Sequence, residues 1–154
     1  MTPSRFVCFL VYRILPRERE LQFLVIDYRS TDPRTGQLSG KQVKFPGGTN
    51  RGHPEETSGT TGIRELMEET GLRAQAREQI WKRIVSQDHV QCAFMSNIDD
   101  CLGVLRLEPF VDDDGDQLAP PRWVDSQTLG RELFDSHQGP FLAALARLRE
   151  RGIY

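Results

Sequence analysis

The sequence predicts a mixed α/β domain in which a β-sheet is covered by helices on both faces. Two runs rich in Val, Ile, Phe and Leu, at residues 6–15 and 21–28, have the composition of buried strands. A helical pattern follows at 57–70, and a second one at 140–151 places apolar residues at core-facing spacing. Mixed strands with a central helix and terminal helices fit a sheet that is covered on both faces.

Length and composition indicate one globular domain over residues 1–154. Hydrophobic residues make up 38% of the chain and charged residues 27%, which is ordinary usage for a protein with a single core. The formal net charge is -2 and no basic stripe is present, so we expect no nucleic acid polymer as a partner. A small-molecule partner is expected, and a homodimer is left open.

No segment has the features of a membrane span or a cleaved leader. The apolar run at 6–12 is followed by arginines without a small-residue cleavage site. No stretch approaches the roughly 20 apolar residues that cross a bilayer. The cysteines lack metal-binding spacing and are expected to be reduced thiols. We therefore expect a cytoplasmic protein.

The first half of the chain is predicted to open with a hairpin. Residues 6–15 and 21–28 flank the charged turn at 16–20. A polar loop at 30–40 contains an Asp-Pro pair and two glycines, and a short strand is expected at 42–45.

The second half is predicted to contain a further hairpin and then helices. Strands are expected at 79–86 and 90–98, with a turn between them. A short strand at 122–124 follows a long acidic loop, and helices are expected at 126–134 and 140–151.

The most informative segment is the run RELMEETGL at residues 64–72. At 3.6 residues per turn, Glu65, Glu68 and Glu69 share one face of the helix, which we expect to face solvent. Like charges at these spacings repel by roughly 0.2 to 0.5 kcal/mol per pair. A hard divalent cation would convert that repulsion into a binding site. An ordinary solvated glutamate face is the alternative.

The rest of this helix is predicted to pack inward and to end at Gly71. Ile63, Leu66 and Met67 fall opposite the glutamates and are expected in the core. Glycine is a frequent helix terminator, so Gly71 places the acids near the negative end of the helix dipole. Glycines at 59 and 62 each cost about 1 kcal/mol in a helix, which predicts either a later helix start or a closely packed neighbour.

The residues upstream complete a recognisable pattern. FPGG at 45–48 is a turn whose glycines allow a ligand to approach the backbone, and Glu56 lies eight residues before Arg64. With these residues the sequence resembles the Nudix hydrolase family. The family box reads Gly, five residues, Glu, seven residues, Arg-Glu, an aliphatic residue, any residue, Glu-Glu, any residue, Gly and an aliphatic residue. From Glu56 to Leu72 the match is complete.

One departure from the box lies in the loop before Glu56. Counting back six residues gives Asn50 rather than glycine, which we interpret as a two-residue insertion with Gly48 in the role of the family glycine. The inserted residues fall in the segment 51–54. The insertion leaves open whether Glu55 or Glu56 fills the first acidic position.

The resemblance implies the Nudix fold, an α/β/α sandwich of a mixed sheet between helices, and a metal-dependent pyrophosphohydrolase. Glu65 and Glu69 are then the principal ligands of Mg²⁺ or Mn²⁺, and the Gly48 carbonyl is an additional one. Glu68 is a further ligand or the base that acts on water. Arg64 would hold a glutamate, Glu56 in particular, by charge-assisted hydrogen bonds.

A later loop offers further carboxylates, because members of this family often draw an extra acidic ligand from such a loop. A polar turn that binds no metal explains the same residues. The candidates are Asp112, Asp113, Asp114 and Asp116.

Substrate recognition rests on three candidate residues. Lys44 and Arg29 could meet phosphate, with solvated surface charge as the alternative, and Trp123 could stack on a base, with a core position as the alternative. A (d)NTP or related nucleotide is the expected substrate. A nucleotide-binding module without turnover and a coenzyme A or dinucleotide diphosphatase are the alternatives.

Overall fold

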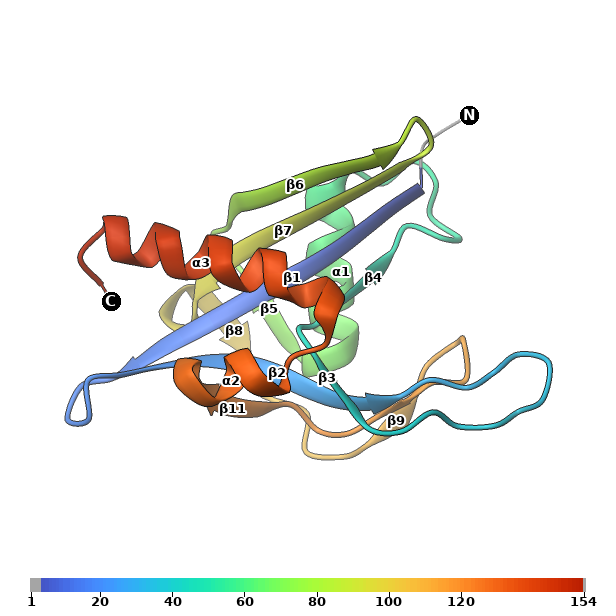
Figure 1. Cartoon of the computed structure of the whole chain (residues 1–154), viewed down its shortest axis with the longest axis horizontal. Coiled ribbons are helices and arrows are strands. Elements are labelled where there is room, and N and C mark those ends of the chain that lie inside the picture. Colours follow the sequence, from blue (N-terminus) through green and yellow to red (C-terminus); the bar gives the residue numbers. More distant parts are fainter. Residues whose placement is uncertain (1–3, 154) are drawn as a thin grey trace.

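The computed structural model describes residues 4–153. The hairpin predicted at the start of the chain lies in the centre of the sheet. β1 (Ser4–Leu15) pairs antiparallel with β2 (Glu20–Arg29). β1 also pairs in parallel with β7 (His89–Asn97). The longest strand therefore lies in the middle of the sheet and supports the elements on both sides (Figure 1).

The remaining elements are shorter. The other strands are β3 (Gln42–Lys44), β4 (Gly47–Thr49), β5 (Leu72–Ala74), β6 (Glu78–Ser86), β8 (Cys101–Gly103), β9 (Phe110–Val111), β10 (Gln117–Leu118) and β11 (Arg122–Asp125). The helices are α1 (Ser58–Thr70), α2 (Ser126–Glu132) and α3 (Gln138–Glu150), with short 3-10 helices η1 (Ile98–Asp100) and η2 (Asp135–His137).

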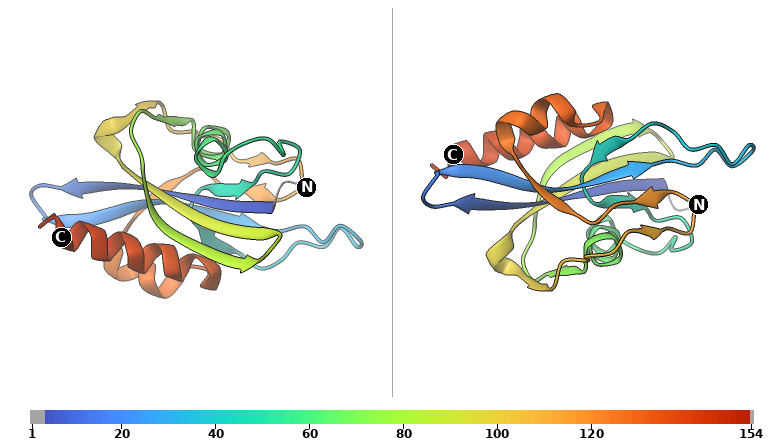
Figure 2. Two further views of the ribbon diagram at one scale, coloured as in Figure 1. Left: turned by 90° about the horizontal axis from the view of Figure 1, so that it is seen from above. Right: turned by 90° about the horizontal axis from the view of Figure 1, so that it is seen from below.

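The sheet separates two apolar clusters, each covered by helices. The strand order is β6-β7-β1-β2-β10-β9, with β3 and β11 also on β2 and β4 on β1. α1 lies on one face, and α2 and α3 lie on the other (Figure 1, Figure 2). Leu10 packs in the cluster that contains Phe141 and Leu148, whereas its neighbour Phe9 packs in the cluster that contains Leu66. This period-two alternation follows from strand geometry and confirms the predicted sandwich.

The longer predicted elements are confirmed to within a few residues. The sequence did not reveal β4, β5, β8, β9 or β10, which have two or three residues each and are too short to show a period. Within residues 4–153, no helix is both long and apolar enough to cross a membrane.

The prediction for the inward face of α1 was partly wrong. Leu66 is fully buried, but Met67 is 43% exposed and Glu69 is buried. The inward stripe follows the positions 62, 66 and 69, which recur at helical spacing. Met67 is rotated about 100° from Leu66 and falls outside that stripe.

Close packing, rather than a late helix start, explains the glycines in α1. The helix begins at Ser58, and the side chain of Thr57 caps it by accepting a hydrogen bond from the Thr60 amide. A β-carbon at Gly62 would lie 3.0 Å from Cγ1 of Val7 and 3.3 Å from the Phe9 ring. The missing side chain lets α1 lie close to β1.

Replacing Gly47 with alanine should lower the free energy of unfolding by about 1 to 3 kcal/mol. A β-carbon there would overlap the Val7 carbonyl oxygen, which is backbone and cannot rotate away. Urea unfolding of Gly47→Ala measures the effect. Gly40→Ala is the matched control because no atom lies within 4 Å of its β-carbon, and it should remain within about 0.5 kcal/mol of wild type. Equal stability of the two variants would contradict the packing described for β4.

Candidate active site

A cavity of about 580 Å³ lies where β4, α1, the 112–116 loop and η2 meet; we call it the carboxylate cavity. The structure brings most of the predicted site residues to it. Its charged lining residues include Lys44, Arg64, Glu65, Glu68, Glu69, Asp112, Asp113, Asp114 and Asp116.

The three glutamates of α1 lie at different depths. Glu69 is almost fully buried, Glu65 is largely buried, and the Glu68 side chain is 53% exposed. The helix ends where the sequence predicts, at Gly71, which has a φ of 84° and donates its amide to the Met67 carbonyl. The predicted solvent-facing position is therefore correct only for Glu68, because α1 is rotated so that Glu69 lies beneath β4.

Glu69 forms a buried ion pair with Lys44. Nζ of Lys44 lies 2.8 Å from Oε2 of Glu69, and the Gly47 amide donates to Oε1 at 2.8 Å. Lys44 also donates to the Gly47 carbonyl at 3.3 Å, and its side chain is only 15% exposed. The alternative that Lys44 is a solvated surface charge is thus wrong.

The pKa values of both members of this pair are raised, for different reasons. Burial raises the pKa of the Glu69 carboxyl, and the Lys44 ammonium and the Gly47 amide oppose that rise. Burial works to lower the pKa of Lys44, but the negative charge of Glu69, together with their hydrogen bond, outweighs it and raises that pKa. The Lys44 side chain therefore keeps its proton next to Glu69.

Arg64 lies against Glu56 and not against Glu55. Its Nε and Nη2 donate to the two carboxylate oxygens of Glu56 at 3.0 Å each. These hydrogen bonds lower the pKa of Glu56. Nη1 of Arg64 reaches Glu65 at 3.1 Å and Glu68 at 3.3 Å, and Nη2 donates to the Thr49 carbonyl at 3.1 Å. Arg64 therefore connects the loop before α1 to two glutamates of the helix.

The missing side chain of Gly48 leaves room for the Glu65 carboxylate. A β-carbon at Gly48 would lie 2.6 Å from Cδ and Oε1 of Glu65. Burial, and next the charge of Glu69, raise the pKa of Glu65 to about 7. The surroundings of Glu65 therefore disfavour its ionised form, because the charge of Arg64 does not offset burial and the neighbouring Glu69.

The donor set fits a hard divalent cation, although the carboxylates are held apart in this structure. Among the described residues, no three His, Cys, Asp or Glu side chains are arranged to hold a metal ion. Arg64 and Lys44 engage the oxygens that would have to converge. Carboxylate and carbonyl oxygens are nevertheless the ligands that hard divalent cations favour.

The acidic loop at 112–116 forms the polar turn that was the alternative to a metal-binding role, and it also lines the carboxylate cavity. Asp112 accepts hydrogen bonds from the amides of Asp114 and Asp116, at 3.0 and 2.9 Å, and Asp116 accepts one from the Thr31 amide at 2.9 Å. These two aspartates stabilise the turn. Burial raises the pKa of Asp112, while Asp113 and Asp114 are exposed at the edge of the carboxylate cavity.

His137 lines the carboxylate cavity, and sequence reasoning missed it. Nδ1 accepts a hydrogen bond from the Phe45 amide at 3.3 Å, and the ring lies edge-on to Phe6 at 5.8 Å. Burial, aided by the charge of Lys44, lowers its pKa to about 3. The imidazole is therefore neutral with its proton on Nε2. A lone histidine before a helix carries no sequence signal for this position.

Two predicted substrate residues lie outside the carboxylate cavity. Arg29 lines a neighbouring cavity with Tyr28, which lines both. Trp123 lines neither of them. Its ring lies 4.3 Å from the Arg13 guanidinium and packs beside the cluster that contains Leu66, so the structure does not bring it to the glutamates.

Comparison with known proteins identifies the fold. No family model and no curated protein sequence matches the chain. A mutT/nudix family protein from Listeria innocua matches with a TM-score of 0.66 and 19% identity, covering 99% of both chains. The NUDIX domain of Shewanella oneidensis NrtR, complexed with ADP ribose, matches with a TM-score of 0.64 and 17% identity, covering 96% of this chain and 90% of that domain.

A third solved structure agrees with these two. An ADP compounds hydrolase matches with a TM-score of 0.63 and 16% identity, over 100% of this chain and 78% of that chain. The chain therefore has the Nudix fold.

Removing only one partner of the buried ion pair should be strongly destabilising. Lys44→Met leaves the Glu69 carboxylate buried without its cation, so we expect the free energy of unfolding to fall by about 3 to 5 kcal/mol. The double variant with Glu69→Gln should recover about 1 to 3 kcal/mol of that loss. Urea unfolding without divalent ions measures both. Lys41→Met, at an exposed lysine, should change stability by about 0.5 kcal/mol or less, and strictly additive effects of Lys44→Met and Glu69→Gln would contradict the pairing.

Acid should destabilise the protein through His137. The unfolded chain protonates this imidazole below pH 6.5, whereas the folded chain resists protonation down to about pH 3. Its contribution is complete above pH 6.5 and is lost as the pH falls toward 3. Between pH 7 and pH 5, wild type should lose about 2 kcal/mol more stability than His137→Gln. Denaturant unfolding at both pH values measures this, and parallel losses would show that the histidine is not buried as described.

Proposed function

We propose that this chain is a metal-dependent pyrophosphohydrolase that cleaves a diphosphate linkage in a nucleoside diphosphate derivative, such as a (d)NTP or a related nucleotide. The observation that carries the proposal is the placement of Glu65 and Glu69 directly against the Gly47-Gly48 strand. These four residues all line the same open cavity. Such a cavity suits a substrate whose own oxygens share the metal.

The proposed metal is Mg²⁺ or Mn²⁺. Glu65 and Glu69 would hold it, with Glu68 and the Gly48 carbonyl as additional ligands. When bound, an ion of this kind screens the charge of the phosphate oxygens and lowers the pKa of a bound water.

The protein's own residues would position the reacting groups. Arg64 keeps Glu56 and Glu65 in fixed relative positions through its hydrogen bonds. Glu68 is the most exposed of the helix glutamates, so its carboxylate can accept the proton of the attacking water when it does not ligate the metal. Lys44, released from Glu69, would place an ammonium beside the phosphate oxygens.

The similar structures support the substrate class. One of them is a Nudix domain complexed with ADP ribose, and another is an ADP compounds hydrolase. Both proteins are described with ADP, which is a nucleoside diphosphate. A substrate of this class supplies the diphosphate oxygens that the glutamates and Lys44 would face.

A nucleotide-binding module without turnover is the second candidate, and the Lys44–Glu69 pair favours it. The ammonium already neutralises the most buried glutamate, so it competes with a metal ion at that position. The two candidates differ in whether divalent ions displace Lys44 and support hydrolysis.

Glu69→Gln should reduce kcat by more than about 100-fold, which is a loss of about 3 kcal/mol in transition-state stabilisation. The amide is nearly the same size as the carboxylate but cannot supply the same charge to the ion. Phosphate and pyrophosphate release from nucleoside triphosphates, ADP-ribose and dinucleotides, with Mg²⁺, Mn²⁺ or chelator, measures turnover. Wild-type rates in this folded variant would refute the ligand assignment, and no turnover by wild type on any substrate would favour the binding module.

The adjacent glutamates at 55 and 56 provide a matched pair. Glu56→Gln removes the charge that anchors Arg64 and should lower turnover by about 10- to 100-fold. Glu55→Gln alters an exposed neighbour and should retain wild-type kcat/KM. Equal losses in the two variants would show that Arg64 does not act through Glu56.

A further inference from the structure

A second cavity, of about 400 Å³, lies next to the carboxylate cavity and shares Tyr28 with it. We call it the hairpin cavity because β9 and β10 form one side of it. The β9-β10 strands line the hairpin cavity, whereas the 112–116 loop that joins them lines the carboxylate cavity. One hairpin therefore borders both spaces.

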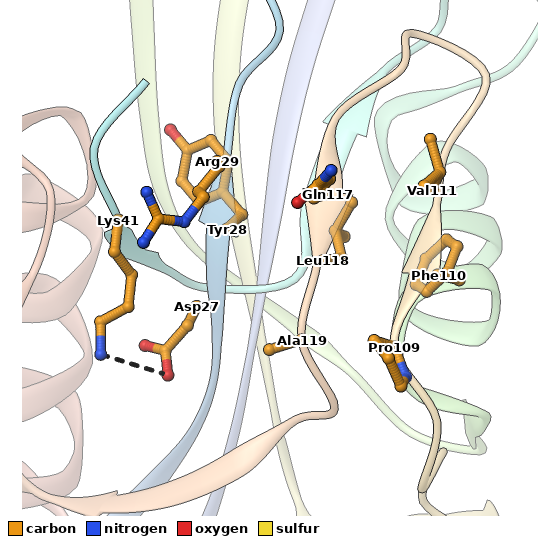
Figure 3. Close-up of a pocket in the computed structure, with 10 residues that line it drawn as sticks. All are labelled: Asp27, Tyr28, Arg29, Lys41, Pro109, Phe110, Val111, Gln117, Leu118 and Ala119. Atoms are coloured by element: carbon orange, nitrogen blue, oxygen red, sulfur yellow. Dashed lines mark ion pairs between the residues drawn. The ribbon is translucent and has the colours of Figure 1, made fainter. Parts of the chain in front are cut away.

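The walls of the hairpin cavity differ in chemistry (Figure 3). Asp27, Arg29 and Lys41 lie on one side and Phe110 lies on the other, with Gln117 between them. The apolar side is completed by Pro109, Leu118 and Ala119. This combination suits a ligand that has apolar faces and hydrogen-bonding edges.

The aromatic wall is tied to the glutamate helix. The Arg106 guanidinium lies 4.0 Å from the centroid of the Phe110 ring. The Arg106 guanidinium donates a hydrogen bond to the Glu68 carbonyl at 2.6 Å, and the Arg106 backbone amide donates one to the Thr70 carbonyl at 2.8 Å. Phe110 is thereby held at a set position relative to the end of α1 that carries the glutamates.

The opposite wall is also held in place. Gln117 is in register with Arg29, and Leu118 with Tyr28, in the pairing of β10 with β2. Arg122 donates two hydrogen bonds to Asp27, each of 2.9 Å. The cavity is therefore formed before a ligand arrives, which reduces the ordering that binding requires.

We propose that the hairpin cavity binds the nucleobase of the substrate whose diphosphate lies in the carboxylate cavity. This inference rests on the proposed function and assigns Phe110 as the residue on which the base stacks and Gln117 as a specificity-determining residue. The Phe110 ring offers an aromatic surface on which a flat base can stack, and stacking of this kind accepts any of the bases. The Gln117 amide both donates and accepts at a base edge. Arg29 and Lys41 lie on the same side of the cavity as Asp27, which pairs with the Lys41 ammonium at 3.9 Å (Figure 3).

The two cavities are neighbours that share Tyr28, which favours one ligand with a part in each. Tyr28 lies between the cavities, and the Lys44 ammonium is 5.3 Å from its ring centroid. A nucleotide has the required order of parts, with an aromatic base at one end and anionic oxygens at the other. A flexible acyl chain would match the apolar wall but would make no hydrogen bond to the Gln117 amide.

The test is metal-free binding, measured by isothermal titration calorimetry in chelator. The probes are AMP, GMP, CMP and UMP, with ribose 5-phosphate as the ligand that lacks a base. At least one of the four should bind about tenfold or more tightly than ribose 5-phosphate. Phe110→Ala should weaken that binding by about tenfold or more, and Gln117→Ala by about threefold or more.

Leu107→Ala is the matched control, because Leu107 is 81% exposed on the same segment and lines neither cavity. It should keep wild-type affinity. Equal binding of ribose 5-phosphate and all four nucleotides, or wild-type affinity in both Phe110→Ala and Gln117→Ala, would overturn the assignment. Because the measurement needs neither metal nor turnover, its failure is separable from failure of the hydrolase proposal.

Discussion

The contact between β4 and α1 is the constraint on which the rest of the site depends. Gly47 lies so close to β1 that no side chain fits, and its amide reaches Glu69 beneath it. Gly48 leaves only enough space for the Glu65 carboxylate. The strand can approach the helix this closely because Gly62 in turn lets α1 lie on β1. Glycines in three places thus bring backbone and carboxylates together, at a position where side chains would separate them.

This close approach creates an electrostatic problem that two cations relieve. Carboxylates removed from water are costly unless they are paired. Lys44 pairs with Glu69 from β3, and Arg64 pairs with Glu56 and Glu65 from within α1. The relief is incomplete, since the pKa of Glu65 remains raised to about 7. A protein selected for stability alone would gain by replacing such residues with apolar ones. Their presence is explained if the charge is needed for a ligand.

The sequence predicts the positions of the helices and strands better than it predicts which side chains are buried. The strands of the first hairpin and the helix over 58–70 follow from composition and spacing, because each is long enough to show its period. Periodicity also places Glu65, Glu68 and Glu69 on one face, but it does not set how far α1 is rotated against the sheet. That rotation buries Glu69 and exposes Met67. His137 and Phe110 reach their cavities only through tertiary contacts, so no local pattern could reveal them.

A crystal structure with bound Mn²⁺, located by its anomalous scattering, would decide whether the glutamates of α1 hold a metal ion. We expect a peak within about 2.3 Å of oxygens of Glu65 and Glu69, near the Gly48 carbonyl, with the Lys44 ammonium displaced from its present 2.8 Å contact with Glu69. A fully occupied Lys44–Glu69 ion pair at saturating Mn²⁺, without a peak in the carboxylate cavity, would contradict this expectation.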